Sequence, residues 1–231
     1  MAHQKRYIRD AILALLNMPV AKQAMVDWTN SHMKEINRVS SEFFMYYGQA
    51  MDGWSALEGG LALWFAKLTR MPPKRARRIF YSARSFNGRA EMFEAALSVA
   101  RLPKGTSALL KTIIKTARKY SAFRNRLAHG EANVHTDIVD GKPTFEMLIT
   151  EPQYQERMTR EHGISVEDIK AANDAFRVLA GDLMMVFNGE IAAAQLEERR
   201  ELILQRPNLP SSKESAPNPS KQKKPPRPSR A

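Results

Sequence analysis

Residues 106–130, TSALLKTIIKTARKYSAFRNRLAHG, determine how the rest of the chain is interpreted. The stretch contains no acidic residue, and its single histidine, His129, is followed directly by a glycine. Apolar residues recur at every third or fourth position, which predicts a helix from about residue 106 to 129 that ends at Gly130. The predicted core face of this helix consists of Leu109, Leu110, Ile113, Ala117, Tyr120 and Leu127.

The last turns of this helix combine charge with a histidine on a face that is not apolar. At about 100° per residue, Asn125 and His129 lie one turn apart outside the core arc, and Arg124 lies at its edge. Further basic residues fall in line with His129 toward the start of the helix: Lys111, Lys115 and Arg118. The sequence therefore predicts a histidine at the end of a basic stripe.

These residue types suit phosphodiester cleavage in RNA without a metal. An imidazole can accept a proton from the 2′-hydroxyl or donate one to the leaving oxygen. A guanidinium such as that of Arg124 binds phosphate and stabilises the extra negative charge of the transition state. Asn125 can orient either the imidazole of His129 or the phosphate. Arg126, on another side of the helix, is expected to contact solvent or phosphate.

Hydrophobic periodicity predicts that most of the remaining body is helical. A run of "MPPK" after Leu68 ends one long helix, and Ser85 and Ser165 are candidate N-caps for later ones. The pattern changes to two short β-like runs around Asp140-Gly141, which predicts a hairpin. The helices are expected over residues 4–17, 20–33, 35–68, 86–100 and 165–204, with a basic turn or short helix over 74–85.

This pattern predicts an all-α fold, a helical bundle with a small hairpin inserted before its last long helix. We expect three parts: accessory helices over residues 1–33, a helical domain over 34–205, and a disordered, basic, proline-rich tail over 206–231. The tail has either a solubilising role or loose contact with phosphate.

The charge and composition limit the partners and the kinds of site that the chain can have. A net charge of +12 favours a polyanionic partner, nucleic acid before anionic membrane. The absence of cysteine excludes disulfides and thiolate metal sites, and the histidines lack metal-ligand spacing, so no metal or cofactor is expected. No run approaches the roughly 18 apolar residues of a membrane span, so we expect a cytoplasmic protein.

Two further features have two readings each, and a third has one. Arg75 and Arg78 lie in a basic run that either follows an RNA backbone or solvates a loop. Glu58 lies on an apolar seam, where it either orients Arg124 or another site arginine by an ion pair or reaches water. Gly59 and Gly60 beside it are expected to allow close helix packing.

The motif RNRLAHG, at the end of an amphipathic helix and followed by a hairpin and one more long helix, resembles the signature of HEPN domains. The resemblance covers about residues 35–200, but only the motif itself is sharply defined. It implies a metal-independent endoribonuclease in which two copies of the motif face each other in a homodimer, leaving 2′,3′-cyclic phosphate ends. By position, Arg124, Asn125 and His129 would form the catalytic group.

The resemblance also implies biological settings and alternatives. Many HEPN proteins are toxins or antiviral defence effectors, which an antitoxin or another regulatory protein can control. Other members lack activity and bind RNA or a protein partner, which is our alternative reading of this chain. A further alternative is a membrane-surface protein that uses the N-terminal helix and the basic tail.

Overall fold

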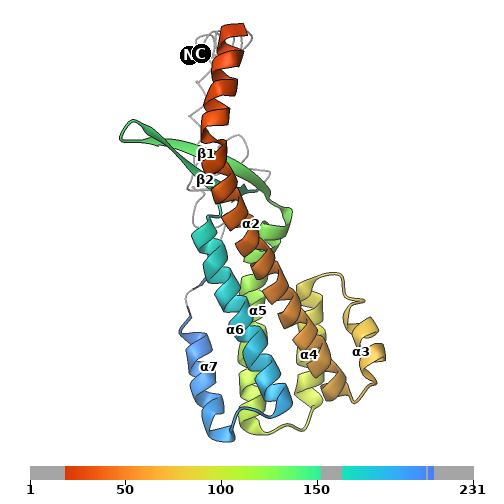
Figure 1. Ribbon diagram of the computed structural model, residues 1–231. Coiled ribbons are helices and arrows are strands. Elements are labelled where there is room, and N and C mark those ends of the chain that lie inside the picture. Colours follow the sequence, from red (N-terminus) through yellow and green to blue (C-terminus); the bar gives the residue numbers. More distant parts are fainter. Residues whose placement is uncertain (1–18, 152–162, 207, 211–231) are drawn as a thin grey trace, which may run out of the picture.

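A computed structural model describes residues 19–151, 163–206 and 208–210, and its longest element is α2 (Pro19–Thr69). The predicted helices over 20–33 and 35–68 are therefore one continuous helix, because no glycine or proline interrupts residues 20–47. The domain boundary expected at residue 34 falls inside it. The N-terminal part of α2 extends beyond the bundle (Figure 1). The helix expected over 4–17 and nearly all of the tail lie outside the described residues.

The core forms where α2 packs along α6 (Val166–Asn188) (Figure 1). Trp54 and Trp64 of α2 are buried in this core, and the Trp64 indole Nε1 donates to the carbonyl of Leu183 at 2.9 Å. Gly60 permits this approach, since a Cβ atom there would lie 2.7 Å from Leu183 Cδ2. Phe43 occupies the core position on this face, whereas its neighbour Phe44 is 52% exposed.

Three shorter helices complete one side of the bundle: α3 (Pro73–Phe80), α4 (Phe86–Val99) and α5 (Lys104–His129). The basic stretch after "MPP" is thus a helix rather than a turn. The hydroxyl of Ser85 caps α4 by accepting from the backbone N–H of Gly88 at 3.1 Å, as predicted. All six residues predicted for the core face of α5 are buried.

The predicted hairpin consists of β1 (Glu131–Val139) and β2 (Lys142–Thr150), paired antiparallel. Asp140 and Gly141 both adopt positive φ, at 51° and 73°, which is the conformation of the two central residues of a type I′ turn. The hairpin crosses the upper part of α2 (Figure 1), where the ring centroids of Phe145 and Trp28 lie 5.7 Å apart.

The predicted last long helix is two helices. The capping box of Ser165 and Asp168 starts α6 as expected, but Gly189, at a φ of 75°, caps its end after Asn188. A 3₁₀ turn over Ala193–Gln195 (η3) leads into α7 (Leu196–Leu204), which returns alongside α5. The fold is mostly helical with one hairpin, and within the described ranges no helix is long and apolar enough to cross a membrane.

Candidate functional site

The residues of the RNRLAHG motif occupy the last two turns of α5, immediately before β1. Asn125 and His129 are exposed, whereas Arg124 is partly buried, as the helical wheel predicts. Arg124 Nη1 donates to the side-chain oxygen of Asn125 at 3.2 Å. The motif asparagine therefore holds the guanidinium next to the face that carries the histidine.

The guanidinium of Arg124 has few partners among the residues that the structure describes. Its Nε is covered by neighbouring atoms and has no acceptor there, and its Nη1 donates to Asn125. No acidic side chain in the described part of the chain forms an ion pair with it. A cation with so little compensation at a half-buried position can stabilise an anion that approaches from solvent.

Gly130 fixes the position of His129 by allowing the strand to begin directly after the helix. Its backbone is extended, at a φ of −81°, so it is not the left-handed cap that glycine usually provides. A Cβ atom at this position would lie 2.2 Å from Ile149 Cγ2 and 2.9 Å from the carbonyl oxygen of Arg126. The glycine is therefore required by the close approach of β2 to the end of α5.

The contacts of Arg126 lie within the protein, whereas the sequence predicted contact with solvent or phosphate. Its Nε lies 3.1 Å from Glu151 Oε2, its Nη1 donates to the carbonyl of Pro210 at 3.1 Å, and its side chain is only 11% exposed. The guanidinium connects the end of α5 to the end of β2 and to the segment after α7. Two of its five N–H donors are therefore used within the protein, and phosphate contact by Arg126 stays a prediction.

The basic stripe along α5 is present but uneven. Lys111 and Lys115 are exposed, and neither forms an ion pair within the described residues. Arg118 instead pairs with Glu94 of α4 at 2.9 Å, with its side chain 34% exposed. The two lysines therefore contribute most of the uncompensated charge on this face, and RNA contact by all three residues stays a prediction.

Glu58 does have an ion-pair partner, but the partner is not a residue of the motif. Glu58 Oε2 lies 3.2 Å from Arg89 Nη1 on α4, and the two side chains are 12% and 13% exposed. The hypothesis that Glu58 orients Arg124 is therefore replaced by a link between α2 and α4. No local pattern points to this pair, because Glu58 and Arg89 lie 31 residues apart on different helices.

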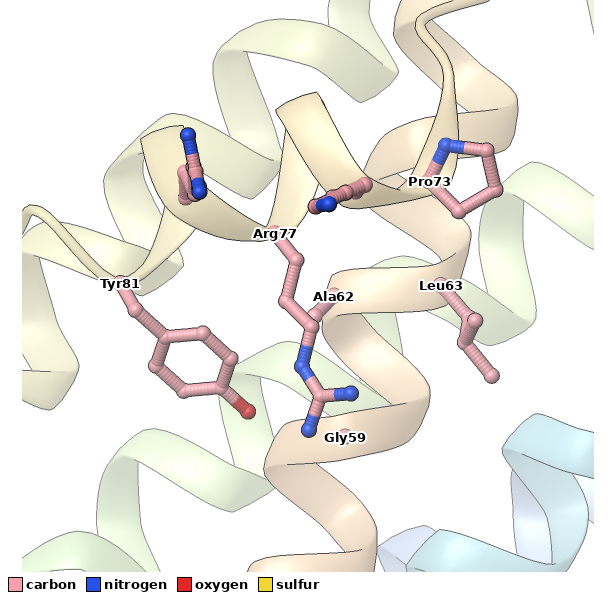
Figure 2. A pocket seen from close by; sticks show the side chains of 8 residues that line it. Gly59, Ala62, Leu63, Pro73, Arg77 and Tyr81 are labelled. Carbon is pink, nitrogen blue, oxygen red and sulfur yellow. The ribbon is translucent and has the colours of Figure 1, made fainter.

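A cavity of about 610 Å³ between α2 and α3 was not predicted (Figure 2). It brings Arg78, one of the predicted RNA-binding residues, together with Lys74, Arg77 and Tyr81. Arg75 is exposed on α3 but does not line the cavity. The motif residues of α5 are not among the lining residues, so the two regions are distinct.

Comparison with known proteins identifies no relative. No family model matches the chain, and neither the curated proteins nor the solved structures include a match. Across residues 19–151 and 163–210, apart from residue 207, no group of three histidine or carboxylate side chains could hold a metal ion.

Proposed function

We propose that the chain is a HEPN-like, metal-independent endoribonuclease and that Arg124, Asn125 and His129 form its catalytic group. The observation that carries the proposal is the arrangement at the end of α5. There the histidine and the asparagine share an exposed face, and the asparagine holds the guanidinium beside them at 3.2 Å. The hairpin and α6 follow α5 in the order that the resemblance implies.

The proposed reaction requires only groups of the protein and of the RNA. The imidazole of His129 accepts the proton of a 2′-hydroxyl, and the oxygen attacks the adjacent phosphorus. The bond to the 5′-oxygen breaks, and a protonated group returns a proton to that oxygen. Arg124 stabilises the negative charge that develops on the phosphoryl oxygens. The products are a 2′,3′-cyclic phosphate and a 5′-hydroxyl.

In the HEPN arrangement the second proton-transfer group comes from another copy of the motif. Homodimer formation is therefore part of the proposal, as is control by an antitoxin or other regulatory protein. Toxins and antiviral effectors are the settings in which such an enzyme acts. The exposed position of His129 at the end of a helix is compatible with a facing copy.

The test is cleavage of a defined RNA by the full chain in EDTA. We expect fragments with 2′,3′-cyclic phosphate ends, and no cleavage of the same RNA carrying 2′-O-methyl groups. His129→Ala and Arg124→Ala should remove the activity, whereas Lys119→Ala, on another exposed side of α5, should retain it and so exclude a contaminating nuclease. RNA binding without cleavage would favour the non-catalytic binding module, and a requirement for Mg²⁺ would contradict the proposed chemistry.

A further inference from the structure

The cavity between α2 and α3 has the size and the walls of a small-molecule site. Its volume of about 610 Å³ falls in the usual range of ligand pockets. Ala62, Leu63 and Pro73 supply apolar walls. Figure 2 shows the side chains of Arg77, on α3, and Tyr81, directly after α3, extending toward the turn of α2 that contains Gly59 and Ala62.

Gly59 keeps this space open at a cost to helix stability. A glycine inside a helix is less favourable than alanine by about 1 kcal/mol. Gly59 has no positive φ that would require glycine, and a Cβ atom there would meet nothing within 4 Å. The prediction of close packing is therefore confirmed for Gly60, which contacts Leu183, and is wrong for Gly59. A side chain at residue 59 would instead occupy the cavity.

Three cations surround the opening. Lys74, Arg77 and Arg78 lie three and four residues apart on α3, so they project on one side of this helix. All three are exposed, and none pairs with an acid among the residues that the structure describes. The nearby carboxylate of Glu58 is already bound to Arg89. The opening is therefore suited to a group with more than one negative charge.

A planar aromatic group completes the lining. The ring centroid of Tyr81 lies 5.9 Å from Arg77 Cζ and 5.5 Å from Arg89 Cζ, both within the range of cation–π contact. The Tyr81 phenol is neutral at ordinary pH like any tyrosine, and burial, and then the charge of Glu58, raise its pKa further. A flat, neutral surface beside guanidinium groups suits an aromatic base.

We propose that this cavity binds a phosphorylated nucleoside, with the base against Tyr81 and the apolar wall and the phosphate at Lys74, Arg77 and Arg78. An acyl carboxylate would fill the apolar part but carries a single charge, whereas three uncompensated cations match a phosphate. The proposal goes beyond the proposed ribonuclease activity and does not depend on it, because none of the motif residues lines the cavity.

The first test is calorimetric titration of the full chain with AMP. We expect a Kd below about 1 mM and a loss of at least about tenfold in affinity in Gly59→Leu, whose side chain fills the cavity. Gly48→Leu is the matched control, because Gly48 lies in the same helix, also has nothing within 4 Å of its Cβ position, and does not line the cavity. Absence of AMP binding, or equal affinity in Gly59→Leu and wild type, would overturn the proposal.

The second test separates the two parts of the ligand. Adenosine and ribose 5-phosphate should each bind at least about tenfold more weakly than AMP, and Arg78→Gln should weaken AMP but not adenosine. Inorganic phosphate binding as tightly as AMP would show that the cavity recognises charge alone. Binding of decanoate that Gly59→Leu abolishes, without binding of AMP, would identify an acyl anion site. Either result contradicts a nucleoside ligand.

The same chemistry can come from a free nucleotide or from one nucleotide of an RNA. The two sources are distinguished by competition binding to the His129→Ala variant. This variant should keep the cavity intact and leave the competing RNA uncut. Displacement of AMP by a 5′-phosphorylated oligoadenylate would identify an RNA terminus, and its failure to displace AMP would identify a free nucleotide. This measurement reports binding only, so a chain that binds AMP but never cleaves RNA would contradict the proposed function and leave the cavity assignment standing.

Discussion

The end of α5 and the cavity between α2 and α3 separate two properties that an active site usually combines. The α5 end presents a histidine and an uncompensated arginine on an exposed face. The α2–α3 cavity has walls, cations and an aromatic ring, but its lining includes neither a histidine nor a carboxylate. The reactive groups and the hollow with apolar walls therefore lie in different regions, so the α5 end needs RNA or a second copy of the chain to exclude water.

After the loss of His129, the largest effect that we predict is that of Arg124 at the α5 end. Arg124→Ala should slow RNA cleavage by about 100-fold, because one donor to the transition-state charge is lost. The melting temperature should remain close to wild type, since the side chain is only partly buried and donates to a neighbouring exposed residue, Asn125. Single-turnover cleavage and thermal unfolding of the same preparation measure both quantities.

Arg126→Ala provides the matched contrast within the motif. Removal of this nearly buried guanidinium leaves Glu151 without its ion-pair partner and should lower the free energy of unfolding by about 1–3 kcal/mol. Where the variant remains folded, its cleavage rate should stay within a fewfold of wild type. A stable Arg126→Ala protein with a rate as low as that of Arg124→Ala would remove the distinction that the contacts draw between these two arginines.

Substitution of one glycine in each region compares the two regions by the free energy of unfolding. Gly130→Ala should lower the free energy of unfolding by about 1–3 kcal/mol, because its Cβ would overlap Ile149. Gly59→Ala should raise it by roughly 0.5–1 kcal/mol, because the added methyl group enters open space in a helix. Urea unfolding of both variants measures whether each substitution raises or lowers the free energy of unfolding. A destabilised Gly59→Ala would show that the glycine serves packing after all.

The lysines of the α5 stripe allow a smaller, electrostatic comparison. Replacing Lys111 and Lys115 by glutamine should reduce the slope of log affinity against log salt for single-stranded RNA by about 1.4, because two phosphate contacts are lost. The same replacement at Lys22 and Lys34, exposed on the N-terminal part of α2, is the control and should leave the slope unchanged. Equal slopes in the two double variants would mean that RNA does not follow the α5 stripe.

The smallest expected effect is spectroscopic and concerns the cavity. Because burial and Glu58 raise the pKa of Tyr81, this phenol should ionise at higher pH than an ordinary tyrosine. The difference in ultraviolet absorbance between wild type and Tyr81→Phe should therefore appear only above about pH 10. AMP affinity should accordingly be flat between pH 8 and 9. Ionisation of Tyr81 below pH 10 would contradict the half-buried position of the ring.

Local patterns predicted the faces of individual helices well. The core face of α5, the cap at Ser85 and the turn at Asp140-Gly141 each depend on residues close in sequence, and all were confirmed. The division of the last helix was missed, although Asn188-Gly189 is a helix-ending pair, because apolar spacing resumes after it. The continuity of α2 was missed because the apolar stripe is weak over its N-terminal part, where most side chains are exposed.

Features that depend on tertiary packing could not be predicted. The partners of Arg126 and Glu58 are Glu151 and Arg89, which lie 25 and 31 residues away in sequence, and the basic run offered several equivalent candidates. The cavity depends on the angle at which α3 packs back on α2 after two prolines, which no local pattern specifies. The place of the motif at a helix end was predicted correctly because residues 124–129 belong to one helix and Gly130 follows directly.

The most direct test of the central claim is the single-turnover rate of RNA cleavage in EDTA by His129→Ala relative to wild type, with His135→Ala as the control. We predict that loss of the α5 histidine slows cleavage by roughly 100- to 10,000-fold, while loss of the hairpin histidine changes the rate less than twofold. Equal rates for wild type and His129→Ala would contradict the assignment of the end of α5 as a ribonuclease site.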